Sequence, residues 1–174
     1  MEQLPLETQR LSLRPYELVD ASQVKRLAGD SRVSSSTLNI PHPYTLEMAQ
    51  EWISTHGDEW QARAALIYAV TRKDTDQLLG TVSLVEINGG KAELGYWFGF
   101  PHWGNGYCSE AVAALIEFSF SMVGISALYA EHLADNPASG RVMRKNGMQP
   151  TGCIHKKNRA GISTRIETYE LKHR

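Results

Sequence analysis

The spacing of hydrophobic residues predicts that the first part of the chain is mainly helical. Residues Arg10–Arg14 alternate polar and apolar side chains and then meet Pro15, which is typical of a short strand that ends in a turn. Asp20 is a candidate cap for a first helix that would carry Val24 and Leu27. Thr45 begins a second helix, and its buried face would comprise Ala49, Trp52, Ile53, His56 and Trp60.

The middle of the chain has the character of β-strands. Residues 66–71 and 78–87 are β-rich, and residues 92–98 follow the tripeptide Asn88-Gly89-Gly90. Because Asn and Gly adopt positive φ at low cost, this tripeptide predicts a hairpin turn. The middle segment therefore predicts a meander of strands.

After Pro101, helices and strands alternate. One helix would begin near Tyr107, end at Gly124 and bury a face made of Ala111, Leu115, Phe118 and Met122. The rest of the chain predicts a strand over 126–133, a short helix from Asn136 or Pro137 to Asn146-Gly147, and strands over 148–156 and 163–171. A meander followed by strand–helix–strand crossovers predicts an α/β fold with a mixed sheet flanked by helices.

Composition and charge exclude several classes of protein. The 174 residues suffice for one domain, and 42% hydrophobic with 21% charged residues is ordinary for an ordered globular chain. The net charge of −1 provides no field that would recruit nucleic acid or an anionic membrane. No apolar run approaches the roughly 20 residues that span a bilayer.

The two cysteines, Cys108 and Cys153, carry little structural information. Neither has a Cys or His partner at zinc-ligand spacing, so no metal site is predicted. They also cannot form a multi-bridge framework, and the N-terminal residues lack a signal-peptide pattern. We therefore expect a cytoplasmic protein.

A glycine-rich loop is the first candidate for chemistry. Gly104-Asn105-Gly106 lies between a predicted strand and a predicted helix, where free amides and the helix dipole favour an anion. The loop lacks the Gly-Lys-Ser/Thr ending of a P-loop, and Ser109 stands where a dinucleotide fingerprint has its third glycine. Taken alone, the two glycines favour a simple chain turn over an anion site.

The residues around this loop resemble a known family. Glu93-Leu94-Gly95-Tyr96-Trp97 and Trp103-Gly104-Asn105-Gly106-Tyr107-Cys108-Ser109-Glu110-Ala111 are similar to the acetyl-CoA-binding motif of the GNAT superfamily, in particular of the bacterial ribosomal-protein N-terminal acetyltransferases, the Rim type. Asn136-Pro137-Ala138-Ser139 and Arg144-Lys145-Asn146-Gly147-Met148 resemble a second block of that family. Cys108 replaces the usual Ala, and Met148 replaces the usual Phe. The resemblance covers residues 8–172 as a single domain.

The resemblance implies a fold in which two parallel strands splay apart and receive acetyl-CoA as co-substrate. Backbone amides of the loop would hold the pyrophosphate, and the strand that ends near Phe100 would pair with the pantetheine arm. One amide of that strand would polarise the thioester carbonyl. The implied acetyl-CoA-binding residues are Phe98, Phe100, Trp103, Gly104, Asn105, Gly106, Tyr107, Cys108, Ser109, Asn136 and Ser139. Asn136 is also a candidate helix cap.

Transfer to an amine requires a base and a proton donor for the departing thiolate. By analogy with the family, Ser139 is the candidate donor, although it is equally explained as a surface hydroxyl. The family's downstream Glu has no counterpart in Cys153–Asn158, so Glu93 is our candidate base. Its alternative is a strand-edge charge paired with Lys91 or an arginine. Glu131 and His132 alternate on one strand, so only one is expected to face the site.

The acceptor is not determined by these patterns. The resemblance favours a protein N-terminus, with a small amine or a non-catalytic acyl-CoA sensor as alternatives. His42, Tyr44, Trp52, Trp60 and Trp97 are candidates to frame the acceptor, although helical spacing favours a core role for Trp52 and Trp60. An acyl-cysteine at Cys108 is disfavoured, because no nearby group activates the thiol. The resemblance also allows a homodimer, which no sequence feature requires.

Overall fold

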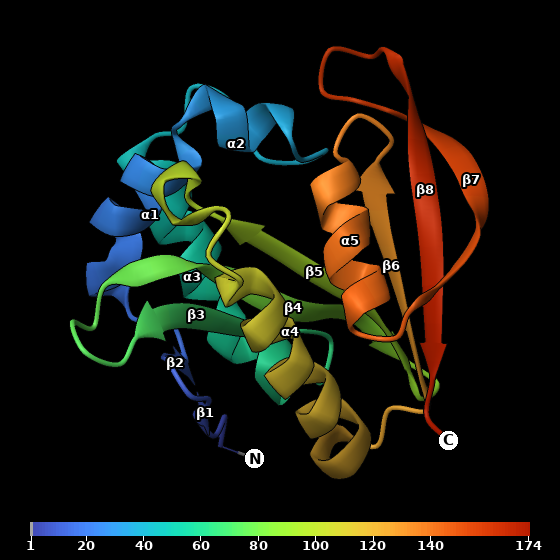
Figure 1. The fold of residues 1–174 in the computed structure, drawn as a ribbon. Coiled ribbons are helices and arrows are strands. Elements are labelled where there is room, and N and C mark those ends of the chain that lie inside the picture. Colours follow the sequence, from blue (N-terminus) through green and yellow to red (C-terminus); the bar gives the residue numbers. More distant parts are fainter. Residues whose placement is uncertain (1) are drawn as a thin grey trace.

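An eight-stranded sheet forms the centre of the molecule, and helices cover both of its faces (Figure 1). The computed structural model describes residues 2–174, apart from the side chain of Met122. In chain order the elements are β1 (Leu6–Glu7), β2 (Leu11–Arg14), α1 (Ala21–Ala28), α2 (Ser31–Ser35), α3 (Leu46–Gln61), β3 (Leu66–Arg72), β4 (Leu78–Asn88), β5 (Lys91–Phe98), α4 (Tyr107–Phe118), β6 (Ala127–Leu133), α5 (Pro137–Lys145), β7 (Gln149–Lys157) and β8 (Ser163–Lys172). Among the described residues, no helix has both the length and the apolar character that a membrane crossing requires.

One parallel pair of strands interrupts an otherwise antiparallel sheet. The strand order is β1-β2-β3-β4-β5-β6-β8-β7, and within residues 2–174 only β5 and β6 run parallel. These two strands pair over Lys91–Glu93 and Ala127–Tyr129, and beyond those residues they diverge (Figure 1). The expected mixed sheet, with splayed parallel strands and flanking helices, is therefore confirmed.

The predicted helices and strands are present, with small differences at their ends. The hairpin turn has positive φ at Gly89 and Gly90, of 55° and 75°. Gly124, with φ of 72°, ends the helical segment after a last turn that widens to a π-helix over Ser119–Val123. The predicted place of Met122 on the buried face lies outside the described residues. Strand β1 and helix α2 were not predicted, because 2 and 5 residues are too short to show a periodicity.

Asp20 occupies the N-cap position of α1 but does not cap it with its side chain. Its carboxylate instead accepts hydrogen bonds from Arg14 Nη1 and Nη2, at 2.8 and 2.9 Å, and from the Glu17 amide at 2.9 Å. Burial would raise the pKa of Asp20, but these hydrogen bonds outweigh it and lower the pKa. The capping prediction is wrong because leaving a buried carboxylate without its charged partner costs more free energy than leaving the helix without a side-chain cap. Thr45 does cap α3, through the Met48 amide at 3.2 Å.

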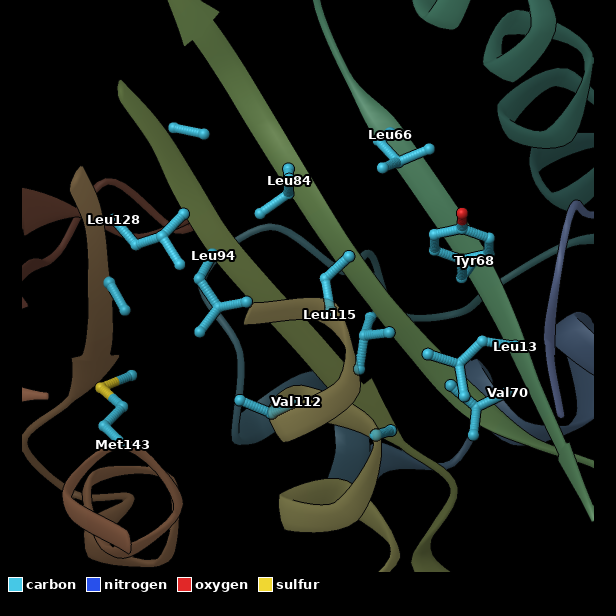
Figure 2. Close-up of a cluster of buried hydrophobic side chains, with 14 of the residues drawn as sticks. Leu13, Leu66, Tyr68, Val70, Leu84, Leu94, Val112, Leu115, Leu128 and Met143 are labelled. Carbon is cyan, nitrogen blue, oxygen red and sulfur yellow. The ribbon is translucent and has the colours of Figure 1, made fainter. Parts of the chain in front are cut away.

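The sheet separates two hydrophobic cores, and strand β3 contributes to both. Leu66, Tyr68 and Val70 face α4 and α5, whereas Ile67 and Ala69 face α1 and α3. Figure 2 shows the first core, in which Val112 and Leu115 of α4 and Met143 of α5 lie against strand side chains.

The predicted buried face of α3 is largely confirmed, because Ala49, Ile53, His56 and Trp60 are all buried. Burial lowers the pKa of His56 to about 4, so this histidine is neutral at physiological pH. Trp52 belongs to the same face but is only partly buried.

Helix α5 is held close to the sheet by a glycine. A Cβ atom on Gly140 would lie 2.6 Å from His132 Nε2 and 3.0 Å from the Tyr169 hydroxyl. We predict that Gly140→Ala lowers the free energy of unfolding by about 1–3 kcal/mol, as expected for an overpacked site. Thermal and urea denaturation would measure the loss.

Gly57→Ala is the matched control, because Gly57 lies in helix α3 and a Cβ there meets nothing within 4 Å. This change should stabilise the protein by about 0.5–1 kcal/mol through helix propensity alone. Equal stability gains in both variants would contradict the proposed contact of α5 with His132.

Candidate functional site

A cavity of about 1250 Å³ lies beside the gap between β5 and β6 and is lined by residues from both faces of these strands. Alternation along β5 explains why the cavity has walls on both faces. Leu94 and Phe98 belong to the α4/α5 core, and Tyr96 packs against it, whereas Trp97 packs on the α3 side. The lining includes Glu93, Phe98, Trp103, Gly104, Gly106, Tyr107, Cys108, Ser109, Asn136 and Ser139.

Phe100 and Asn105 are the two predicted site residues that do not line this cavity. Phe100 contacts the ring of Trp103, and the guanidinium of Arg32 lies 3.4 Å from the centre of its ring. Asn105 donates side-chain hydrogen bonds to the carbonyls of His102 and Trp103, at 3.2 and 3.0 Å. Asn105 therefore stabilises the loop from within.

The loop presents a row of free backbone amides. Gly104 and Gly106 have positive φ, of 75° and 77°, which turns the chain into α4. Within residues 2–174, the amides from Gly104 to Ser109 donate to no protein acceptor. Amides at a helix N-terminus are suited to bind an anion, because they also lie at the positive end of the helix dipole.

The turn between β1 and β2 supports this loop through Thr8 and Arg10. Arg10 donates from Nη1 to the Asn105 carbonyl at 2.9 Å and from Nε to Glu110 at 2.7 Å. Glu110 also accepts from the Thr8 hydroxyl at 2.6 Å and from the Arg10 amide at 2.9 Å. Because Arg10 neutralises Glu110, this carboxylate does not repel an anion bound at the loop.

Strand β5 keeps one edge free where β6 diverges from it. In the described chain, no strand pairs with this edge beyond Glu93. The indole Nε1 of Trp103 donates to the Phe98 carbonyl at 2.7 Å, which fixes the end of the strand beside the loop. Free strand-edge groups can pair with an extended ligand that carries amides.

Ser139 and Tyr96 form a reciprocal pair across the cavity. The Ser139 hydroxyl donates to the Tyr96 hydroxyl at 2.9 Å, and the Tyr96 hydroxyl donates to the Ser139 carbonyl at 2.8 Å. Burial raises the pKa of Tyr96, so its phenol stays protonated. No side-chain role was predicted for Tyr96, although this residue lies within the motif that carries the family resemblance.

Glu93 lies on the opposite face of the sheet from Ser139, within a group of carboxylates. Burial raises its pKa, and the nearby charges of Glu131 and Glu86 raise it further. Glu131 is paired with Lys156 at 2.6 Å, and Glu86 accepts from the Tyr129 hydroxyl at 2.7 Å. Among the described residues, Glu93 makes no ion pair with Lys91 or an arginine.

Glu131 and His132 both border the cavity, which corrects the expectation that only one would. The two side chains do alternate, but the cavity has walls on both faces of the sheet. His132 is 9% exposed and lies beneath Gly140, with Nδ1 2.7 Å from the Leu133 carbonyl. This histidine therefore packs α5 against β6.

Asn136 occupies the N-cap position of α5 but does not cap the helix through its side chain. Its Nδ2 instead donates across the cavity to the Ser36 carbonyl at 3.1 Å. Arg159 makes a similar bridge, from Nη1 to the Asn39 carbonyl at 2.6 Å. These two bonds connect the segment after α2 with the C-terminal half of the chain, above the α3 side of the cavity.

The residues expected to frame the acceptor do not all line the cavity. Tyr44, Trp52 and Trp97 line the cavity, Trp60 is a core residue as expected, and His42 lies outside the lining. Burial raises the pKa of Cys108, so its thiol stays protonated, as expected for a residue with no activating neighbour.

Comparison with known proteins assigns the family. Residues 10–149 match the model of the acetyltransferase (GNAT) domain. YoaA, an uncharacterised N-acetyltransferase of Bacillus subtilis (strain 168), is 30% identical over 151 residues, which cover 86% of this chain and 85% of YoaA. The ribosomal-protein-serine acetyltransferase of Escherichia coli (strain K12) is 33% identical over 81 residues, 45% of each chain.

A solved structure agrees with this assignment at the level of the fold. The ribosomal L7/L12 alpha-N-protein acetyltransferase RimL, in complex with coenzyme A, has a TM-score of 0.88 at 19% identity, covering 97% of this chain and 98% of RimL. The resemblance inferred from the two motifs is thus confirmed. Because the family model and the YoaA alignment each span most of the sequence, the chain belongs to the GNAT acetyltransferase family and is an N-acetyltransferase.

Proposed function

We propose that this protein transfers an acetyl group from acetyl-CoA to a primary amine, with a protein N-terminus as the preferred acceptor. The observation that carries the proposal is one cavity that joins free amides and an unpaired strand edge on one side of the sheet to carboxylates on the other. The first set of groups suits an acyl-CoA, and the second suits an amine. The donor and the acceptor would then meet at the gap between β5 and β6.

The residues on the donor side fit CoA. The amides from Gly104 to Ser109 would hold the pyrophosphate, and the free edge of β5 up to Phe98 would pair with the pantetheine arm. Asn136 would contribute the carbonyl of its side chain, since its Nδ2 is bound to Ser36. When bound, acetyl-CoA supplies the acetyl group as a thioester, which leaves a thiolate to be protonated.

Ser139 is the proposed donor of that proton, and Tyr96 orients it. The hydroxyl of Ser139 points to Tyr96 at 2.9 Å and lies on the wall of the cavity. Because Tyr96 stays protonated, it can hydrogen-bond to the serine oxygen when the serine hydroxyl turns toward the sulfur.

Glu93 is the proposed base that accepts a proton from the incoming ammonium group. Its raised pKa makes it a better proton acceptor than an ordinary Glu. The neighbouring carboxylates also attract a protonated amine to this side of the sheet.

Two acceptor classes fit this side of the cavity. The names of the similar ribosomal-protein acetyltransferases support a protein N-terminus. The bridges from Asn136 to Ser36 and from Arg159 to Asn39 narrow the access and favour a slender acceptor, which includes small amines. The cytoplasmic location and the homodimer remain predictions from the sequence and its family resemblance.

The acceptor class is tested by a thiol-release assay with acetyl-CoA and a panel of N-terminal peptides and small primary amines. We expect turnover with peptides that carry a free N-terminus, and Glu93→Gln should lower it by about 100-fold, the typical contribution of a general base. Turnover with small amines alone would show that the acceptor is a small amine and not a protein N-terminus. Turnover on no member of the panel would indicate an acyl-CoA sensor.

The donor site is tested by Gly106→Trp. Its side chain would block the approach of the pyrophosphate to the amides, so CoA affinity measured by calorimetry should fall by more than about 10-fold. Gly161→Trp is the control, because Gly161 has the same φ of 77° but lies in the β7–β8 loop, outside the cavity. Retained CoA affinity in Gly106→Trp would overturn the loop assignment.

The proton donor is tested by Ser139→Ala and Tyr96→Phe. We expect Ser139→Ala to lower kcat by about 100-fold with little change in the KM for acetyl-CoA. Tyr96→Phe should lower kcat by a smaller factor, about 10-fold, because the serine remains but is no longer oriented. Steady-state kinetics measure both effects, and an unchanged kcat in Ser139→Ala would remove this serine from the mechanism.

A further inference from the structure

Two unpaired cations lie on the donor side of the cavity. Arg141 and Lys145 are four positions apart on α5, so they share one face of the helix, and both line the cavity. Within the described chain, neither makes an ion pair or a side-chain hydrogen bond. Arg10, Arg14 and Arg32, by contrast, are each paired with a carboxylate.

Arg141 and Lys145 lie on a helix that contacts the loop of free amides. Asn146, which follows α5, donates from Nδ2 to the Ser109 hydroxyl at 3.2 Å, so the end of α5 lies against the first turn of α4. Arg141 and Lys145 therefore border the same cavity as the loop that leads into α4, on the helix whose end contacts Ser109. The carboxylates of Glu86, Glu93 and Glu131 belong to the other face of the sheet, where they do not neutralise these cations.

This arrangement suits an anion beyond the one that the loop would hold. CoA carries a pyrophosphate and a separate phosphate on the 3′ position of its ribose. The amides of the loop are placed for the pyrophosphate, which leaves the cations on α5 for the remaining phosphate. An arginine fork and a lysine ammonium are the side chains that bind phosphate most strongly.

We propose that Arg141 and Lys145 bind the 3′-phosphate and make this protein select CoA over 3′-dephospho-CoA. The inference rests on the proposed donor site and deepens it, since it names the part of the cofactor that α5 recognises. The selectivity should weaken as salt concentration rises, because both cations are exposed to solvent.

The test is calorimetric titration of the full chain with CoA and with 3′-dephospho-CoA. We expect the wild-type protein to bind CoA about 10-fold or more tightly than 3′-dephospho-CoA, the effect of one charge-assisted phosphate contact. The double variant Arg141→Gln/Lys145→Gln should reduce this ratio to about 3 or less, through loss of CoA affinity alone. Both residues are exposed, so the variant should keep the wild-type melting temperature.

Arg144→Gln is the matched control. Arg144 lies on the same helix and carries the same charge, but its guanidinium lies 5.6 Å from the ring centre of Tyr169, away from the cavity lining. This variant should keep the wild-type preference for CoA over 3′-dephospho-CoA. If Arg144→Gln lost this preference as fully as the double variant, the preference would depend on the total charge of the helix, and the assignment to Arg141 and Lys145 would be overturned.

Equal affinity of the wild-type protein for both ligands would overturn the inference and leave the proposed donor site intact. Equal loss of both affinities in the double variant would also overturn it, because the cations would then bind the pyrophosphate. Failure of the wild-type protein to bind either ligand would instead overturn the donor site and this inference together.

Discussion

Strands β5 and β6 stop pairing after Glu93 and Tyr129, and the rest of the site depends on this divergence. A central strand with a free edge carries backbone groups that lack partners, which is costly in the interior of a protein. Helix α5 holds the strands apart through Tyr96, which bonds to Ser139, and through His132, which packs beneath Gly140. The unpaired edge is thus held open by packing, and an amide-bearing ligand can complete it.

The divergence also gives the cavity two chemically different ends. Side chains alternate along β5 and β6, so neighbouring residues such as Glu131 and His132 point to opposite faces. The α5 side contributes free amides and cations, and the other side contributes carboxylates. In the reaction that we propose, an anionic donor and a cationic acceptor would approach one gap from opposite sides, as a direct transfer between them requires.

Much of this fold was predictable from the sequence because its signals are local. The hairpin at Asn88–Gly90, the cap at Thr45 and the glycine-rich turn before α4 each depend on the conformational preferences of a few adjacent residues. The capping prediction at Asp20 failed for the opposite reason. Its carboxylate is buried and pairs with Arg14 on another element, and no local pattern reports that contact.

The sequence by itself determined the order of the longer strands and helices and the family, and it predicted the loop that we propose for the cofactor. Periodicity, turn residues and the motif around Gly104–Gly106 all depend on consecutive positions. Only the tertiary structure decided which side chains share the cavity. The pairing of Ser139 with Tyr96 joins residues 43 positions apart, and the Arg10–Glu110 support of the loop spans 100 positions. Such partners are set by how α5 and β2 dock on the sheet, which is a property of packing across the whole chain.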